Sequence, residues 1–313
     1  MGDGLNRARQ MGHVTCAAVL ALVCCAAWGQ GAPNAGAQAE LKGAIEAAQK
    51  AQVAGPSDVR LADQALLKLP KGFVYIPPVE GQRLMQAMGN RVGEGLLGLI
   101  FPESDAQWFV AMRFLKSGYI KDDDAKEWKT DELLKDLKEG TEESNKERRT
   151  RGFPEIEVTG WVEAPKYDAT THRLVWSLAS KVKNAPAGAE NGVNYNTYAL
   201  GREGYISMNL VTGMKGVQAE KPVAQGLLAA LQYNNGKGYR DFNSATDHVA
   251  EYGLAALIGG VAAKKLGLFA LMFAFLAKFA KVIGVAAIAL GALFVKFFRK
   301  KKAEVPPAAP PPA

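Results

Sequence analysis

The chain has 313 residues, of which 48% are hydrophobic and 22% are charged, and its formal net charge is +7. This is an ordinary globular composition, with enough residues for one or two domains that have an apolar core. From Lys264 onward there are nine Lys and Arg residues and one acid, Glu304, so the preceding part of the chain has a net charge of about −1. A nucleic-acid-binding domain needs its positive charge on the folded body, so we predict no nucleic-acid partner.

The N-terminus has the pattern of a secretory signal peptide. Arg7 and Arg9 precede an apolar run at residues 14–27, and small residues at 27 and 29 offer a cleavage site, with 35–37 as a second choice. All three cysteines lie in this segment, so the chain after it has no disulfide and no thiol chemistry. We predict a signal peptide at residues 1–29 and an extracytoplasmic domain at residues 30–247; an uncleaved N-terminal anchor is the alternative.

Apolar residues recur first at helical and then at strand spacing through this domain. A helical stripe around Ile45 is followed by four short apolar runs that are typical of strands, at residues 64–69, 73–76, 96–101 and 108–115. Pro77-Pro78 opens a helix that ends at Gly89, and a charged helix is predicted at residues 130–151.

Two predicted hairpins follow the charged helix. The first has strands near residues 156–162 and 173–178 joined by a loop at 164–170; the second has strands at 193–200 and 205–211 around a glycine-containing turn. Pro222 then opens a helix. Together these elements predict an α+β fold in which an antiparallel, hairpin-rich sheet packs with helices, followed by a C-terminal transmembrane or amphipathic helical anchor.

Residues suited to catalysis are scarce after the signal segment. The remaining histidines are His172 and His248, and the second lies in a polar cluster with Asp241, Asn243, Asp247 and Glu251. This cluster is not a calcium loop, because Thr246 stands where the sharp turn needs Gly. We expect Ser244 or Thr246 to cap the helix that enters the membrane, with Asp247 at the positive end of the helix dipole. If His172 converged with the cluster, a metal or general-base site would form; otherwise His172 is a hydrogen-bonded histidine at a strand end, and we predict no metal and no cofactor.

The apolar segment at residues 252–298 carries lysines that share one side of a helix. Four of them fall within about 100° of one another on a helical projection: Lys264, Lys278, Lys281 and Lys296. With the basic run at 299–302, the segment predicts a membrane anchor at residues 248–302, followed by a proline-rich tail at 303–313. Either one span at 282–298 follows an interfacial helix, which leaves the domain in the periplasm and the C-terminus in the cytoplasm, or two spans turn near Lys278.

Small residues line another side of the same predicted helix, at Ala280, Gly284, Ala287 and Gly291. Such a seam lets helices approach closely, so it favours self-association in the membrane. The alternative is that Ala and Gly are merely common in spanning helices.

Six long phrases in the chain carry a family resemblance. They are LPKGFVYIPP (69–78), YIKDDDA (119–125), LKEGTEESNKERRTRGFP (137–154), GWVEAPKYDATTHRLVWSL (160–178), VNYNTYALGREGYISMNLV (193–211) and GYRDFNSATDHVAEYGLAALIGG (238–260). In this order they resemble a family of bacterial, predicted membrane-anchored proteins whose domain has no assigned function. The resemblance implies an envelope protein with a C-terminal anchor, and it supplies no catalytic residues.

These features favour a membrane-anchored envelope protein that acts as a noncatalytic binding or scaffold module facing the periplasm. One alternative is a periplasmic metal-dependent or acid/base hydrolase that uses the region of Asp241, Asp247 and His248. Another is a subunit of a membrane assembly or transport system.

Overall fold

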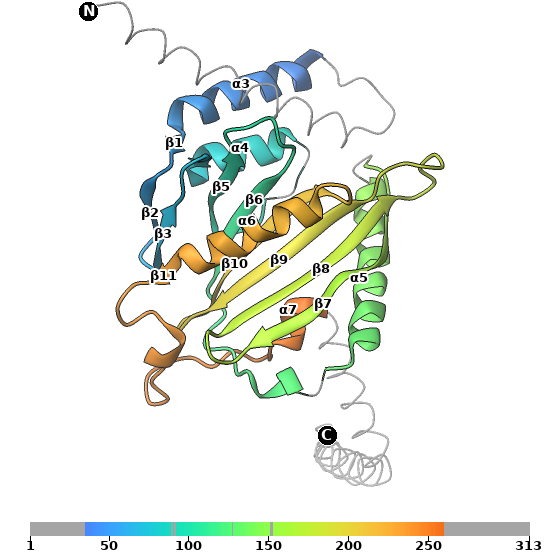
Figure 1. The fold of residues 1–313 in the computed structure, drawn as a ribbon. Coiled ribbons are helices and arrows are strands. Elements are labelled where there is room, and N and C mark those ends of the chain that lie inside the picture. The colour runs from blue at the N-terminus through green and yellow to red at the C-terminus, as the bar shows by residue number, and fades with distance from the viewer. Residues whose placement is uncertain (1–34, 89, 91, 127, 151–152, 260–313) are drawn as a thin grey trace, which may run out of the picture. The chain divides into compact units, whose positions relative to one another are not determined.

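The structure is a computed structural model, and it describes residues 35–88, 90, 92–126, 128–150 and 153–259. An eight-stranded antiparallel sheet with the order β1-β4-β5-β6-β10-β9-β8-β7 lies at the centre of this region (Figure 1). Its strands are β1 (Val53–Ala54), β4 (Phe73–Ile76), β5 (Leu96–Pro102), β6 (Phe109–Leu115), β10 (Tyr205–Gly213), β9 (Gly192–Leu200), β8 (Arg173–Val182) and β7 (Ile156–Asp168). A smaller antiparallel sheet has the order β11 (Leu231–Tyr233), β3 (Ala65–Leu69) and β2 (Ser57–Leu61). The predicted α+β class, with a large antiparallel sheet packed with helices, is confirmed.

The hairpin of β9 and β10 has the predicted register. Leu200 pairs with Tyr205 across the four-residue turn at 201–204. Gly204 has a φ of +155°, and a Cβ there would lie 1.9 Å from the carbonyl oxygen of Leu115. Only glycine leaves room for this approach, so the turn can pack against the end of β6.

Helix α6 (Val217–Ala230) and the smaller sheet cover one face of the large sheet. Ile206, Met208 and Leu210 point to this face and are 0–2% exposed, as their alternation in β10 predicts. They belong to one continuous apolar cluster that also contains Leu227 of α6 and Leu67 of β3. The main core therefore lies under α6.

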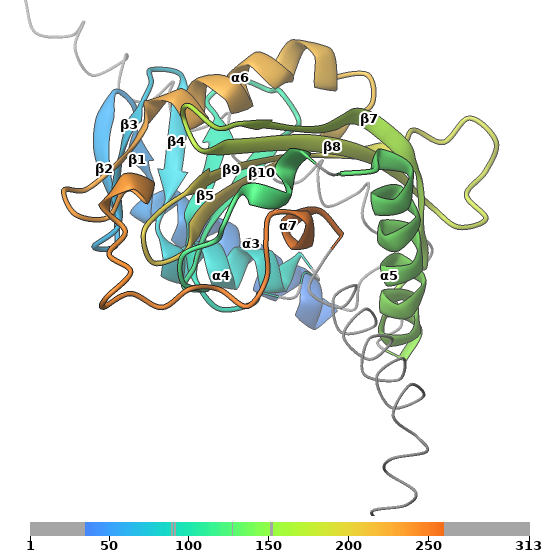
Figure 2. The ribbon, with the colours of Figure 1, turned by 90° about the horizontal axis from the view of Figure 1, so that it is seen from below.

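Four helices pack on the opposite face (Figure 2). Helices α3 (Ala35–Ala51) and α4 (Pro78–Ala87) share an apolar cluster with β4, β5 and β6, and α5 (Thr130–Thr150) and α7 (Ala255–Gly259) share another with β7, β8 and β9. Leu174, Trp176 and Leu178 of β8 are buried in the second cluster. The two predicted hairpins thus bury their apolar residues on opposite faces of one sheet.

Helix α5 also provides hydrogen-bond partners for backbone groups at the outer edge of β7. Asn145 is fully buried; its Nδ2 donates to the Ile156 carbonyl at 2.8 Å, and its Oδ1 accepts from the Ile156 N–H at 2.9 Å. The side chain thereby supplies the two hydrogen bonds that a further strand would make at this point.

The prediction of a loop at residues 164–170 was wrong, because β7 continues to Asp168. Tyr167 pairs with Leu174, and β7 reaches this pairing through three register shifts. Pro165 is tolerated because β7 is an edge strand with bulges, where a missing N–H breaks no ladder hydrogen bond. The turn is shorter than expected and is closed by Asp168, whose carboxylate accepts from the Thr170 N–H at 2.9 Å and the Thr171 hydroxyl at 2.6 Å.

The prediction that Pro222 opens a helix was also wrong, because α6 begins at Val217 and contains Pro222. The turn that precedes the proline is held by the Gly216 carbonyl, which accepts from the N–H groups of Ala219 and Glu220 at 3.0 and 3.1 Å. Val217 is 2% exposed in the main core. Burial of this first turn therefore outweighs the single helical hydrogen bond that Pro222 cannot donate.

Three strands were not predicted: β1, β2 and β11. β1 has two residues and β11 has three, and each forms only by pairing with a strand elsewhere in the chain. Such short runs have no periodicity of their own.

The region before residue 260 ends in contact with the folded domain. Leu254, Leu257 and Ile258 are 0–8% exposed in the cluster under α5, so residues 248–259, which were expected to begin the anchor, pack as part of the domain. No helix starts at Asp247; α7 starts at Ala255, and the Asp124 carboxylate accepts from the Leu254 and Ala255 N–H groups at 3.0 and 3.1 Å. The expected cap by Ser244 or Thr246, with Asp247 in the first turn, was therefore wrong.

Within the described ranges, no helix is long and apolar enough to cross a membrane. The signal peptide at residues 1–29, the rest of the anchor at 260–302 and the tail at 303–313 lie outside those ranges, as do all four lysines and all four small residues of the predicted membrane helix.

Candidate functional site

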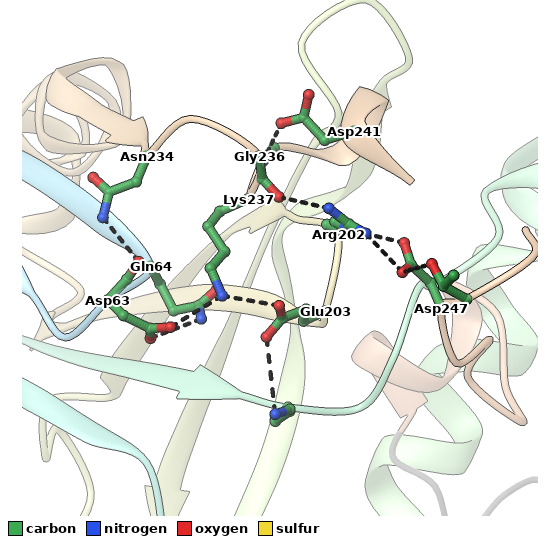
Figure 3. Close-up of polar contacts among 12 residues, drawn as sticks. Asp63, Gln64, Arg202, Glu203, Asn234, Gly236, Lys237, Asp241 and Asp247 are labelled. Carbon is green, nitrogen blue, oxygen red and sulfur yellow. Dashed lines mark hydrogen bonds and ion pairs between the residues drawn. The ribbon is translucent and has the colours of Figure 1, made fainter. Parts of the chain in front are cut away.

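The predicted polar cluster lies in the segment at residues 234–251, which follows β11 and contains one short 3-10 helix at Tyr239–Asp241. Hydrogen bonds join this segment to the β2–β3 turn and the β9–β10 turn (Figure 3). A further hydrogen bond, from Arg240 to the Thr170 carbonyl, joins it to the β7–β8 turn. The candidate residues are therefore surrounded by side chains from distant parts of the sequence, and their partners decide what they can do.

Asp247 forms a bidentate ion pair with Arg202 of the β9–β10 turn. Arg202 Nε is 2.7 Å from Oδ2 and Nη2 is 2.8 Å from Oδ1. The Asn243 N–H and the Thr246 hydroxyl also donate to this carboxylate, at 2.8 and 2.9 Å. The hydrogen bonds from Arg202 and Asn243 hold the pKa of Asp247 well below its usual range, so the carboxylate stays ionised and is a poor proton acceptor.

Lys237 joins the β2–β3 turn of the smaller sheet to the β9–β10 turn of the larger sheet. Its Nζ lies 2.9 Å from Glu203 Oε1 and 3.0 Å from Asp63 Oδ2. Hydrogen bonds from Lys237 lower the pKa of both carboxyl groups. Asn234 adds a hydrogen bond from Nδ2 to the Asp63 carbonyl at 2.8 Å. These contacts fix the relative positions of the β2–β3 and β9–β10 turns (Figure 3).

The other predicted residues of this segment serve its backbone or lie at the surface. Asp241 Oδ2 accepts from the Gly238 N–H at 2.9 Å, and Asn243 Oδ1 accepts from the Ala245 N–H at 3.0 Å. His248 is exposed, and its carbonyl accepts from the Tyr119 N–H at 2.8 Å. Glu251 is exposed.

His172 belongs to a different group of side chains, at the β7–β8 turn. Tyr167 Oη lies 2.7 Å from Asp122 Oδ2 and 3.1 Å from His172 Nδ1. Burial lowers the pKa of His172 against the opposing effect of Asp122, and it raises the pKa of Tyr167. The neutral imidazole is assigned a proton on Nδ1 that is donated to Tyr167 Oη, while Tyr167 donates to Asp122.

Aromatic rings enclose this histidine. The His172 ring lies 4.2 Å from the Tyr239 ring, Tyr239 lies 4.4 Å from Tyr119, and Tyr119 lies 3.9 Å from Phe242, all as centroid distances. His172 Nε2 is buried and has no hydrogen-bond partner among the residues described. His172 shares no hydrogen bond or ion pair with Asp247, so the structure does not bring the predicted residues into one site.

The described part of the chain contains no group of three or more His, Cys, Asp or Glu side chains placed to hold a metal ion. An open hollow of about 370 Å³ between α5 and the β7–β8 pair is lined by Lys138, Glu142, Glu157, Val158 and Lys183. Its charges oppose one another, and Lys183 pairs with Glu142, so it favours no particular ligand charge.

Sequence reasoning missed the residues that decide the chemistry of the candidates. Arg202 and Asp247 are 45 residues apart, as are Asp122 and Tyr167. The contact between Tyr167 and His172 is the one that the sequence could have predicted. A tight turn that starts at Asp168 places these two residues beside each other at the end of the β7–β8 hairpin. No local pattern marks the other partners.

Comparison with known proteins assigns the chain to a family. One family, described as "Protein of unknown function (DUF2167)", matches residues 53–291. The chain belongs to this family. A comparison with curated proteins found no match.

Comparison with solved structures found weak matches, including the following two. The solution structure of cyanobacterial PsbP (CyanoP) from Synechocystis sp. PCC 6803 is 8% identical, with a TM-score of 0.35, and the match covers 58% of this chain and 91% of that one. A structure titled Protein Mog1 E65A mutant is 10% identical, with a TM-score of 0.31, and the match covers 56% of this chain and 94% of that one.

Proposed function

We propose that this family member is a noncatalytic binding or scaffold module of the bacterial envelope, anchored in the inner membrane through residues 260–302 with its folded domain in the periplasm. The observation that carries the noncatalytic assignment is the bidentate contact between Arg202 and Asp247. It keeps the most constrained carboxylate of the predicted cluster ionised and fully engaged, so this group is not available for proton transfer.

The anchor and its direction rest on the sequence pattern. The apolar segment with its one-sided lysines precedes a basic run at 299–302, and a signal-like segment lies at the N-terminus. Self-association through the seam at Ala280, Gly284, Ala287 and Gly291 belongs to the same proposal.

The second candidate is an acid/base hydrolase, and the hydrogen-bonded array of His172, Tyr167 and Asp122 is the observation that favours it. A neutral histidine beside a tyrosine is a usable proton acceptor in principle. In the structure its Nδ1 faces Tyr167 and its Nε2 is buried near aromatic rings, so neither nitrogen is presented to solvent.

Assays of the full chain in a nonionic detergent discriminate these functions. We expect no turnover of p-nitrophenyl esters or phosphates above the rate of a mock purification. A turnover that disappears in Asp247→Asn or His172→Gln, with the circular dichroism spectrum unchanged, would refute the noncatalytic proposal. The exposed Lys71→Gln is the control for nonspecific effects of substitution.

Membrane attachment is tested by fractionation of cells that express the full chain. We expect the protein in the inner membrane after carbonate washing, and digestion of its domain by protease in spheroplasts but not in whole cells. A domain that stays protected in spheroplasts would contradict the periplasmic assignment. Gly284→Leu is expected to reduce the oligomer size in detergent, and an unchanged size would count against the seam.

A further inference from the structure

The sheet face opposite α6 carries a strip of polar residues between its two apolar clusters. The strip crosses three neighbouring strands and consists of Arg113 on β6, Ser207 and Asn209 on β10, and Asn194 and Asn196 on β9. Arg113 is directly opposite Ser207, and Asn209 is directly opposite Asn196. We call this set the polar strip.

Strand alternation puts the members of the polar strip on one face. Ser207 and Asn209 alternate with Ile206, Met208 and Leu210, which are buried under α6. Asn196 is 9% exposed, and the other four members are partly buried. The strip is therefore more desolvated than an ordinary polar surface.

Two groups of the polar strip lack partners of their own. No carboxylate in the described ranges lies within ion-pair distance of Arg113, and Asn209 Oδ1 is buried without a hydrogen bond there. By contrast, Asn209 Nδ2 donates to Asn194 Oδ1 at 3.2 Å, and Asn196 Nδ2 donates to the Asn194 carbonyl at 3.3 Å. The amides are thus oriented, while one cation and one carbonyl acceptor remain unpaired.

The surroundings of Arg113 leave space for its guanidinium. A Cβ on Gly93 would lie 3.1 Å from Arg113 Nη1, so the side chain reaches the loop before β5 where that residue has no side chain. A partly buried guanidinium without a counter-ion, and a buried acceptor without a donor, each disfavour the free state. A ligand with the complementary groups would satisfy both.

We propose that the polar strip binds a small carboxylate that also carries an N–H donor, as the carboxyl-terminal end of a short peptide does. The planar guanidinium of Arg113 matches a carboxylate in two parallel hydrogen bonds. Asn209 Oδ1 accepts from the N–H donor. Asn209 lies two residues along β10 from Ser207, the residue opposite Arg113, so the backbone positions that carry the two groups are offset by about 7 Å along the strand, a spacing that an extended dipeptide matches.

This inference rests on the proposed function, because a noncatalytic module needs a ligand site without an acid/base pair. Arg113 is the charged member of the polar strip, and its guanidinium group donates hydrogen bonds but accepts none. The polar strip can therefore bind a ligand through hydrogen bonds, but it contains no side chain that could act as a general base.

The test is calorimetric titration of the full chain in nonionic detergent with three probes: alanylalanine, its carboxyl-terminal amide, and inorganic phosphate. We expect alanylalanine to bind, and the amide to bind at least about tenfold more weakly because it has no charge for Arg113. Arg113→Gln is expected to lower the affinity for alanylalanine by at least about tenfold as well. Arg60→Gln, which changes an exposed arginine on β2, is the matched control and is expected to leave the affinity unchanged.

A second variant keeps the test decisive if Arg113→Gln does not fold. Asn209→Leu removes the hydrogen-bond acceptor and keeps a side chain of similar shape. We expect it to weaken alanylalanine binding about tenfold and to leave the affinity for phosphate unchanged. Absence of alanylalanine binding, equal binding of the amide, or phosphate binding as tight as that of the dipeptide would each overturn the assignment.

Chromatography of free alanine after the titration separates this inference from the proposed function. Binding without alanine release supports both. Binding followed by alanine release supports the polar strip and refutes the noncatalytic proposal, whereas neither binding nor release overturns the strip and leaves the noncatalytic proposal standing.

Discussion

On the α6 face of the eight-stranded sheet, Ile206, Met208 and Leu210 join one continuous apolar cluster, whereas on the opposite face the polar strip separates two clusters. Both faces are built from the same strands, and in β10 the two kinds of residue alternate one by one. The difference shows that a single strand can bury an apolar core on one side and carry polar groups on the other.

The largest expected effect is on the α6 face. Ile206→Ala removes a fully buried side chain from the main core, and we expect it to lower the free energy of unfolding by about 2–5 kcal/mol. Urea denaturation followed by circular dichroism measures this. The neighbouring Ser207→Ala is the control and is expected to change stability by less than about 0.5 kcal/mol. Equal losses in the two variants would contradict the difference between the faces.

On the opposite face, a carboxylate contributes to the attachment of α7. Asp124→Ala removes the acceptor for the Leu254 and Ala255 N–H groups, and we expect a loss of about 0.5–2 kcal/mol in the same experiment. Asp123→Ala, which changes an exposed carboxylate next to it, is expected to have no measurable effect. If the two variants unfolded alike, apolar contacts alone would hold α7.

Acidification should weaken the half of this face that contains His172. Burial lowers the pKa of His172 below 6.5, so the unfolded chain binds more protons between the two pKa values and stability falls as the pH drops below about 6.5. Unfolding measured from pH 7.5 to pH 5 should therefore depend less on pH in His172→Gln than in the wild type. His248→Gln changes an exposed histidine and should leave the wild-type dependence; an identical curve for all three proteins would sink the explanation.

The smallest effect on stability is expected in the polar strip. Arg113 has no ion-pair partner in the described ranges, so Arg113→Gln should change the free energy of unfolding by less than about 0.5 kcal/mol although it weakens ligand binding. Parallel denaturation and titration of one preparation measure both quantities. A loss above about 2 kcal/mol would show that Arg113 supports the fold, which would remove the sharpest contrast between the two faces.

Much of the secondary structure could be predicted because its signals are local. The alternation in β8 and β10 and the Gly-containing turn at 201–204 identify strands and a hairpin without any distant contact. The pattern did not reveal that β8 and β10 bury their apolar residues on opposite sides. Alternation distinguishes two sides of a strand, but which side a helix covers depends on where that helix packs.

The candidate site was less predictable, since its chemistry depends on pairs of distant residues. The sequence drew attention to Asp247 and His172, but only tertiary structure places Arg202 against the first and Asp122 near the second. Pro222 shows the same limit within a helix: a rule based on one residue favoured a start there, and the burial of Val217 extended the helix beyond it.

The sequence by itself determined the α+β class, most strand and helix positions and the family to which the chain belongs, because turn chemistry, periodicity and long ordered phrases are properties of neighbouring residues. Tertiary structure alone decided which carboxylates form ion pairs, which histidine is buried, and that Arg113, Ser207 and Asn209 share one face. These outcomes depend on distances between residues far apart in the chain, and those distances exist only after the strands have paired.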